Sequence, residues 1–120
     1  MLAKMAVEET GMGVYEDKIQ KNKGKSKAVW NKLKGVKSRG ILEYDDVNDI
    51  VKVAKPIGVI GAITPTTNPT MTPMHNAMVA LKGGNALIVC PHPRAKKTGV
   101  VTVDLMRDAL KAVGAPVDLI

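Results

Sequence analysis

The stretch IGVIGAITPTTNPTMTPMHNAMVALKGGNALIVC, from Ile57 to Cys90, decides the fold class. It begins with a short apolar run, Ile57–Ile63, and ends with another, Ala86–Cys90. Both runs have the length and composition of strands that are buried on both faces of a parallel sheet. Between them, Thr70–Leu81 carries apolar residues at helical spacing. The stretch therefore predicts a strand, a helix and a second strand.

The start and the packing face of this helix can also be predicted. Thr72 is a plausible N-cap, with Pro73 at the first helical position. The side chains of Met71, Met74 and Met78 fall near one face. We expect this stripe to pack against neighbouring elements.

The pattern continues beyond Cys90. Arg94–Val113 predicts a long amphipathic helix, and Val117–Ile120 begins a third apolar run that we interpret as a strand. The order β-α-β-α-β is the start of a doubly wound parallel sheet, a Rossmann-like α/β fold. Two or three such strands leave an apolar edge unpaired, so we expect the fold to be incomplete at Ile120.

The first part of the chain, residues 1–40, predicts two helices. Met1–Thr10 has apolar residues on one face, and Gly11 is suited to end it in a left-handed conformation. Val14–Val36 is a second helical stretch, weakened by Gly24 and too polar for a core helix. Ile41–Ala54 then alternates in the manner of an antiparallel hairpin with an acidic turn.

Charge is concentrated in one part of the 120-residue chain, whose net charge is +7. Asp17–Arg39 contains nine basic residues and one acidic residue. This segment is either a solvated helix face or a surface that meets an anionic ligand. Aromatic residues make up only 2%, which argues against modules that stack single-stranded nucleic acid.

Reactive side chains are few. Cys90 is the single cysteine, which excludes an internal disulfide and a cysteine-based zinc site, and we expect it to be a small core residue. His75 and His92 are too few for a metal site, and we expect His75 to be buried or half-buried. No apolar run spans a membrane and no secretory signal is present, so we predict a cytoplasmic protein with no membrane partner.

The loop after the first predicted strand, Thr64–Pro69, is the first candidate site. Parallel sheets bind ligands where the carboxyl end of a strand meets the next helix. Gly58 and Gly61 lie within the strand, so the loop is not a glycine-rich dinucleotide fingerprint. Asn68 could donate its amide to an oxyanion, or it could simply bond its own backbone in a turn.

A second candidate site follows the second strand at the same predicted edge. His92 and Arg94 could contact a ribose or a phosphate there. They could equally form a capped turn with an exposed arginine.

Several motifs together resemble one family. KPIGVIGAITPTTNPT (Lys55–Thr70) is the most specific, and MAVEETGMG (Met5–Gly13), HPRA (His92–Ala95) and GAP (Gly114–Pro116) extend the match over nearly the whole chain. With these motifs the sequence resembles aldehyde dehydrogenases, and within them the CoA-acylating branch.

The resemblance implies a domain plan and a reaction. Residues 55–120 would be the first half of an NAD(P)-binding domain, and residues 41–54 a hairpin that mediates homo-oligomerisation. The catalytic domain would lie outside these residues. The family oxidises a small aldehyde through a cysteine thiohemiacetal, passes hydride to NAD or NADP, and transfers the acyl group to coenzyme A.

The resemblance also implies roles for individual residues. Asn68 matches the asparagine whose amide stabilises the thiohemiacetal oxyanion. The remaining expected contacts are all to the cofactor: Thr64, Pro65, Thr66 and Thr67 along the cleft, and His92, Pro93 and Arg94 near the adenosine end.

Two departures refine this reading. Hydrolytic members usually carry tryptophan before the asparagine and lysine at the position of Cys90, whereas here Thr67 and Cys90 stand there, which favours the acylating branch. Nothing matches the nucleophilic cysteine, so we expect these residues alone to be inactive. The alternatives are a non-acylating aldehyde dehydrogenase and a small basic binding module.

Overall fold

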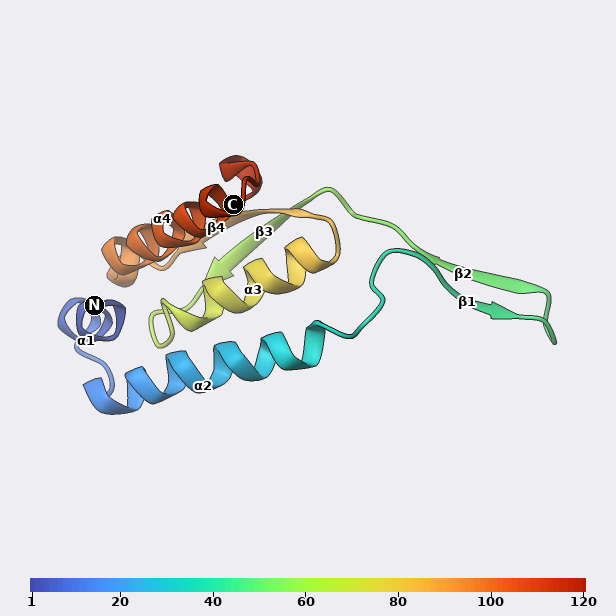
Figure 1. The fold of residues 1–120 in the computed structure, drawn as a ribbon. Coiled ribbons are helices and arrows are strands. Elements are labelled where there is room, and N and C mark those ends of the chain that lie inside the picture. Colours follow the sequence, from blue (N-terminus) through green and yellow to red (C-terminus); the bar gives the residue numbers. More distant parts are fainter.

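The structure is a computed structural model that describes all 120 residues. Two helices come first, then a hairpin, then a β-α-β-α unit (Figure 1). The elements are α1 (Leu2–Thr10), α2 (Tyr15–Leu33), β1 (Gly40–Asp45), β2 (Ile50–Ala54), β3 (Val59–Thr64), α3 (Met71–Lys82), β4 (Ala86–Pro91) and α4 (Lys96–Ala112), with short 3-10 helices at Pro93–Ala95 and Val117–Leu119. No helix is long and apolar enough to cross a membrane.

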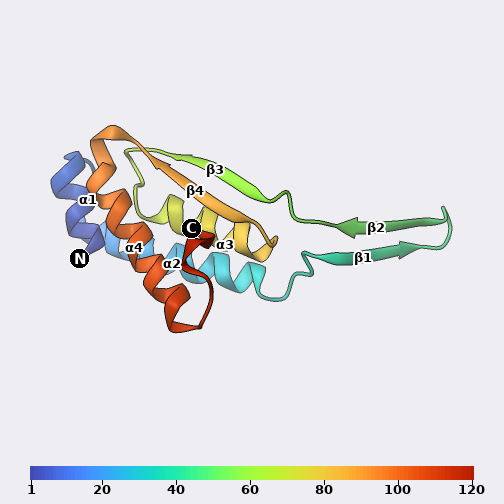
Figure 2. The ribbon, with the colours of Figure 1, turned by 90° about the horizontal axis from the view of Figure 1, so that it is seen from above.

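Strands β1 and β2 form the predicted antiparallel hairpin, which extends away from the rest of the molecule (Figures 1 and 2). This projection makes the molecule elongated, with extents of 56 × 27 × 26 Å. At the acidic turn, the Asp45 carboxylate accepts hydrogen bonds from the backbone and side chain of Asn48. These bonds lower the pKa of Asp45 below its ordinary value.

The base of the hairpin is anchored at one place, the turn between α3 and β4. Ser38 Oγ donates to the Lys82 carbonyl at 2.6 Å. Asn85 Oδ1 accepts from the backbone N–H groups of Ile57 at 2.6 Å and Gly58 at 2.9 Å. Both chain segments that connect the hairpin to the body are therefore held by the same turn.

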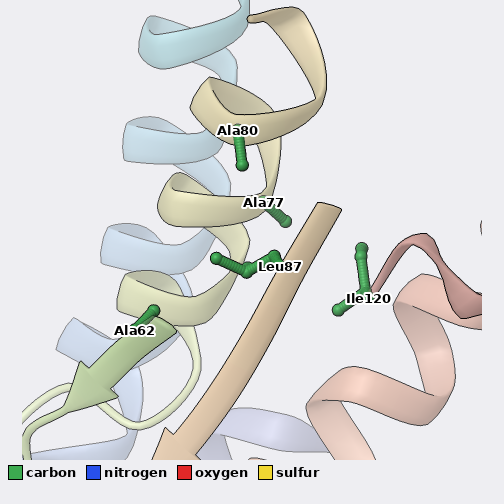
Figure 3. Packing of buried hydrophobic residues seen from close by; sticks show 5 residues of the cluster. All are labelled: Ala62, Ala77, Ala80, Leu87 and Ile120. Carbon is green, nitrogen blue, oxygen red and sulfur yellow. The ribbon is translucent and has the colours of Figure 1, made fainter. Parts of the chain in front are cut away.

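Strands β3 and β4 form a parallel pair, as predicted, with Ile60 opposite Leu87 and Ala62 opposite Val89. Helices α3 and α4 pack against one face of this pair, where Ala62, Ala77, Ala80, Leu87 and Ile120 form the buried cluster (Figure 3). Small alanines allow α3 to approach the sheet closely, because they bring no bulky side chain between the backbones.

The prediction that both strands are buried on both faces is wrong for these residues. Both helices lie on the same face, so the alternate side chains remain uncovered: Ile63 is 88% exposed and Ile88 is 58% exposed. Cys90 shares this open face, so the expectation of a core cysteine is also wrong. Helix α3 joins the two strands and α4 follows them, and together they can cover only one side of a twisted pair.

Two predictions of local structure are wrong. Helix α3 begins at Met71, with Thr70 as its N-cap, not at Pro73 with Thr72 as the cap. Proline is tolerated there because the first-turn N–H groups have no helical partner. Val117–Leu119 forms a 3-10 helix and not a strand, and Arg107 Nε binds the Ile120 carbonyl at 2.7 Å. Because the Ile120 carbonyl accepts from the Arg107 side chain, this segment does not pair with β4 as a third strand.

The methionine stripe packs as predicted, and His75 does not. Met71 is buried, and Met74 and Met78 are half-buried. His75, which follows Met74, is exposed, and its ring forms a hydrogen bond with the side chain of Asn76. Only part of the surface of a helix contacts its neighbours. Successive residues point about 100° apart, so the side chain after Met74 lies in solvent.

The two N-terminal helices form as expected. Gly11 ends α1 with φ 66°, which glycine adopts at no steric cost. Helix α2 ends at Leu33, three residues before the predicted end, and it packs along α3. Its largest side chain, Trp30, is mostly exposed, but its other face makes specific polar contacts described below.

Candidate functional site

The two candidate segments meet at one edge of the sheet. Thr64 ends β3 and stands opposite Pro91, which ends β4. The backbone N–H of His92 donates to the Thr64 carbonyl at 3.2 Å. The Thr64–Asn68 loop and the His92–Arg94 turn therefore leave the sheet side by side, at the edge where doubly wound folds bind ligands.

The side chain of Asn68 is half-buried and forms no hydrogen bond within the chain. Its backbone carbonyl accepts from Thr72 N–H in the first turn of α3, at 3.3 Å. The backbone is thus held while the amide stays free. The simple turn reading predicted a bond from this side chain to its own backbone, and the structure contains none.

A second polar group at this edge lacks a partner. Thr64 is 2% exposed, and its Oγ1 is the one buried side-chain oxygen or nitrogen without a hydrogen bond. Buried polar groups are nearly always paired, because leaving one unpaired costs roughly 1–3 kcal/mol. Pro65 and Thr67 are exposed, and Thr66 is half-buried.

Three side chains of α2 contact the end of the loop and the start of α3; we call them the α2 clamp. Lys18 Nζ donates to the Thr67 carbonyl at 3.0 Å. Asn22 Oδ1 accepts from the Thr70 hydroxyl at 2.9 Å, and Ser26 Oγ contacts Met71 Sδ at 3.2 Å. Positions separated by four residues lie on one helix face, so the clamp is a single polar stripe.

Lys18 is unusual among the lysines of α2 because it is 8% exposed. Burial, together with repulsion from Lys21, lowers the pKa of Lys18. No carboxylate forms an ion pair with it. Its ammonium donates to the Thr67 carbonyl, so it is a partly buried charge whose hydrogen bond is to the loop.

The His92–Arg94 turn has the capped geometry. His92 Nδ1 accepts from Arg94 N–H at 3.1 Å, and all three residues of the turn are exposed. The Arg94 guanidinium reaches the Thr10 carbonyl at the end of α1, at 3.4 Å. The structure thus brings His92 and Arg94 to the sheet edge as a capped turn with an exposed arginine.

Glu9 caps the N-terminus of α4 from a distant part of the chain. Its carboxylate accepts from the backbone N–H groups of Lys97 at 2.8 Å and Thr98 at 2.7 Å, and from the Thr98 hydroxyl at 2.7 Å. Partial burial opposes ionisation, but these hydrogen bonds prevail and lower the pKa of Glu9. Arg94 and Glu9 together fix α1 against the start of α4.

Sequence reasoning missed the clamp and the Glu9 cap. Lys18, Asn22 and Ser26 are four residues apart, which places them on one face of a helix. Nine basic residues in the same segment made this polar stripe hard to recognise. Glu9 carried no signal, since its partners are 88 and 89 positions away.

Comparison with known proteins identifies the fold. The model of the aldehyde dehydrogenase family matches residues 1–120. The chain belongs to this family.

Two relatives with similar sequences indicate the branch of the family. Succinate-semialdehyde dehydrogenase (acetylating) of Clostridium kluyveri is 55% identical over 120 residues, which are 100% of this chain and 26% of that protein. Sulfoacetaldehyde dehydrogenase of an Acholeplasma species is 54% identical over 99% of this chain and 25% of its own length. The chain is homologous to CoA-acylating aldehyde dehydrogenases and spans about a quarter of their length.

Solved structures of related enzymes have the same fold over these residues. An acetylating aldehyde dehydrogenase from Geobacillus thermoglucosidasius matches with a TM-score of 0.92 and 42% identity over 98% of this chain and 26% of its own. A propionaldehyde dehydrogenase of Rhodopseudomonas palustris with bound CoA, and an engineered glycolyl-CoA reductase with bound NADP+, each match with a TM-score of 0.68 and 38% identity, over 98% of this chain and 26% of theirs.

Proposed function

We propose that this chain is part of a CoA-acylating aldehyde dehydrogenase, which oxidises a small aldehyde with NAD or NADP and transfers the acyl group to coenzyme A. One observation carries the proposal. The Asn68 amide has no partner within the chain and projects from a loop whose backbone is held on both sides. A free donor on a fixed backbone is what stabilisation of an oxyanion requires, because little reorganisation is then needed when charge develops.

The proposed role of Asn68 is electrostatic. Attack of a cysteine thiolate on an aldehyde places negative charge on the former carbonyl oxygen. The Asn68 N–H would donate to that oxygen, lowering the barrier to the thiohemiacetal. The half-burial of Asn68 would strengthen this hydrogen bond relative to one in bulk water.

We propose that a nucleotide cofactor, which would accept the hydride, binds at this edge of the sheet. We propose that Thr64, Pro65, Thr66 and Thr67 line its cleft, with His92, Pro93 and Arg94 nearer its adenosine end. The bond from His92 N–H to the Thr64 carbonyl supports this placement, because it brings both segments to one edge of the sheet. Arg94 is exposed and supplies a cation at the same edge.

The nucleophile is proposed to lie outside these residues. Cys90 is exposed on the open face of β4 and forms no hydrogen bond to a base. We therefore expect the 120-residue polypeptide alone to show no aldehyde oxidation. We also propose that residues 41–54 mediate homo-oligomerisation, and that the enzyme is cytoplasmic.

Substitution of Asn68 in the enzyme that contains this segment tests the role of its amide. Asn68→Ala should lower kcat by about 10²–10³-fold, with little change in the KM for the cofactor. The matched control is Asn31→Ala, which removes the same amide from an exposed position of α2. Equal kcat values for Asn68→Ala and the control would refute an oxyanion role.

Product analysis tests the acylating branch. With aldehyde, cofactor and coenzyme A present, the expected product is the acyl thioester, formed in step with the reduced cofactor. Release of free carboxylic acid at the same rate without coenzyme A would instead indicate the non-acylating branch.

A further inference from the structure

The α2 clamp contacts the loop on both sides of Asn68. Lys18 holds the carbonyl of Thr67, the residue immediately before it. Asn22 holds the hydroxyl of Thr70, two residues after it. These contacts span 49 and 48 positions of sequence, so a helix from the N-terminal part of the chain fixes a loop of the nucleotide-binding part.

The Lys18 contact acts on the peptide group that Asn68 shares. The Thr67 carbonyl and the Asn68 nitrogen belong to one planar amide, so holding the carbonyl oxygen fixes the plane from which the Asn68 side chain begins. The other backbone bond of Asn68, from its carbonyl to Thr72 N–H, fixes the following peptide plane. With both planes held, the remaining freedom of the amide is rotation about its own side-chain bonds.

The burial of Lys18 makes this contact specific. Partial burial favours a position in which the ammonium donates to a protein acceptor, and with no carboxylate in reach that acceptor is the Thr67 carbonyl. The other lysines of α2 are more exposed, including Lys23 and Lys25. A solvated helix face needs no buried lysine, so this residue serves the loop and not solubility.

We propose that Lys18 is a positioning residue that holds the Asn68 amide in its reactive orientation through the Thr67 carbonyl. This inference rests on the proposed function, because it needs Asn68 to act on the reacting oxygen. Asn22 supports the same orientation through Thr70. The α2 clamp thereby makes the N-terminal helices part of the active-site framework.

The test replaces Lys18 by methionine in the enzyme that contains this segment. Lys18→Met keeps an unbranched side chain but removes the donor and the charge. A small misplacement of a reacting group costs one to two powers of ten in rate, so we expect kcat to fall about tenfold while the KM for the cofactor stays within about twofold. Lys23→Met, on the same helix without a loop contact, should change neither value.

A double-mutant cycle separates positioning from a general structural role. If Lys18 acts through Asn68, Lys18→Met should lower kcat less than about twofold in the Asn68→Ala background. An equal loss in both backgrounds would overturn the inference while leaving the proposed role of Asn68 intact. If Asn68→Ala itself has no effect, the proposed function of Asn68 and this inference fall together.

A second variant covers poor folding of Lys18→Met. Asn22→Ala removes the Thr70 contact and leaves the Lys18 side chain in place. Its loss of kcat should likewise vanish in the Asn68→Ala background. Persistence of the full loss there would count against the inference in the same way.

Discussion

Glu9 joins two elements through one side chain. It places a carboxylate at the N-terminus of α4, where three donors converge on it. The first N–H groups of a helix lack helical partners and carry partial positive charge, so an anion is stabilising there. The same side chain ties the end of α1 to α4, so its loss affects both helices.

Replacement of this carboxylate should destabilise the protein in a pH-dependent way. Glu9→Gln keeps one acceptor oxygen but removes the charge, and should cost about 1 kcal/mol near neutral pH. The folded state lowers the pKa of Glu9, so its contribution is complete above the ordinary pKa of a glutamate and is lost as pH falls through the lower folded value. Urea unfolding of wild type and variant across this range measures the difference.

The neighbouring glutamate is the matched control for this prediction. Glu8 is exposed, and its ion pair with Lys4 joins side chains that are 62% and 70% exposed. Glu8→Gln should therefore change stability by less than about 0.5 kcal/mol. A pH-independent loss in Glu9→Gln, or an equal loss in both variants, would contradict the capping role.

The sequence predicted the positions of some functional residues and not of others. Asn68 was visible because it stands between prolines and threonines after a strand, and because its motif resembles a known family. The roles of Lys18 and Glu9 were missed, because they depend on partners 49 and more positions away. His75 was misjudged, since a helical stripe predicts which face is apolar but not how far the contact extends around the helix.

Helix α4 crosses the end of β4 at Gly99, and the contact leaves no room for a side chain. A Cβ at this position would lie 2.7 Å from Pro91 Cβ and 3.3 Å from Pro91 Cγ. Gly99→Ala gains about 1 kcal/mol of helix propensity, but overpacking costs about 2 kcal/mol. We expect a net loss of about 1 kcal/mol, measured by thermal unfolding.

Gly24 provides the opposite case within α2. A Cβ there would meet nothing within 4 Å. Gly24→Ala should therefore raise stability by about 1 kcal/mol, because alanine gains the propensity without a clash. If both alanine variants shift the melting temperature in the same direction, the close approach at Gly99 is not what limits that position.

Element types were predictable because period and breakers decide them locally. The change from helical spacing to alternation near Ile41 marked the hairpin, and Gly11 marked the end of α1. The start of α3 was misplaced because Pro73 suits any position of a first turn. Val117–Ile120 was misassigned because a four-residue run with three apolar side chains fits a strand or a turn, and only tertiary contacts decide between them.

For the molecule as a whole, the open face of the β3–β4 pair is the main unsatisfied surface. Val59, Ile63 and Ile88 expose more than half of their area on it. Contiguous apolar surface of this kind drives association in water. The apolar runs in the sequence correctly indicated the two strands, but the 120 residues supply helices for only one face of the pair.

We therefore expect the 120-residue polypeptide, produced alone, to self-associate through this face. Ile63→Lys combined with Ile88→Lys should shift it toward monomer, because association would bury unpaired charges. Val113→Lys is the control, since Val113 is 78% exposed at the end of α4 and lies off the sheet. Sedimentation velocity measures the distribution, and an unchanged profile in the double variant would place the contact elsewhere.

The anchoring of the hairpin has a mechanical consequence. A ribbon fixed only at its base acts as a lever, so a small rotation at Asn85 becomes a large sweep at the tip. Force applied to the tip is delivered in turn to Asn85 and Ser38, the residues that hold the base. That load enters α3 at Lys82, the end opposite the loop of Asn68. The helix is thus a stiff rod with the arm at one end and the candidate site at the other.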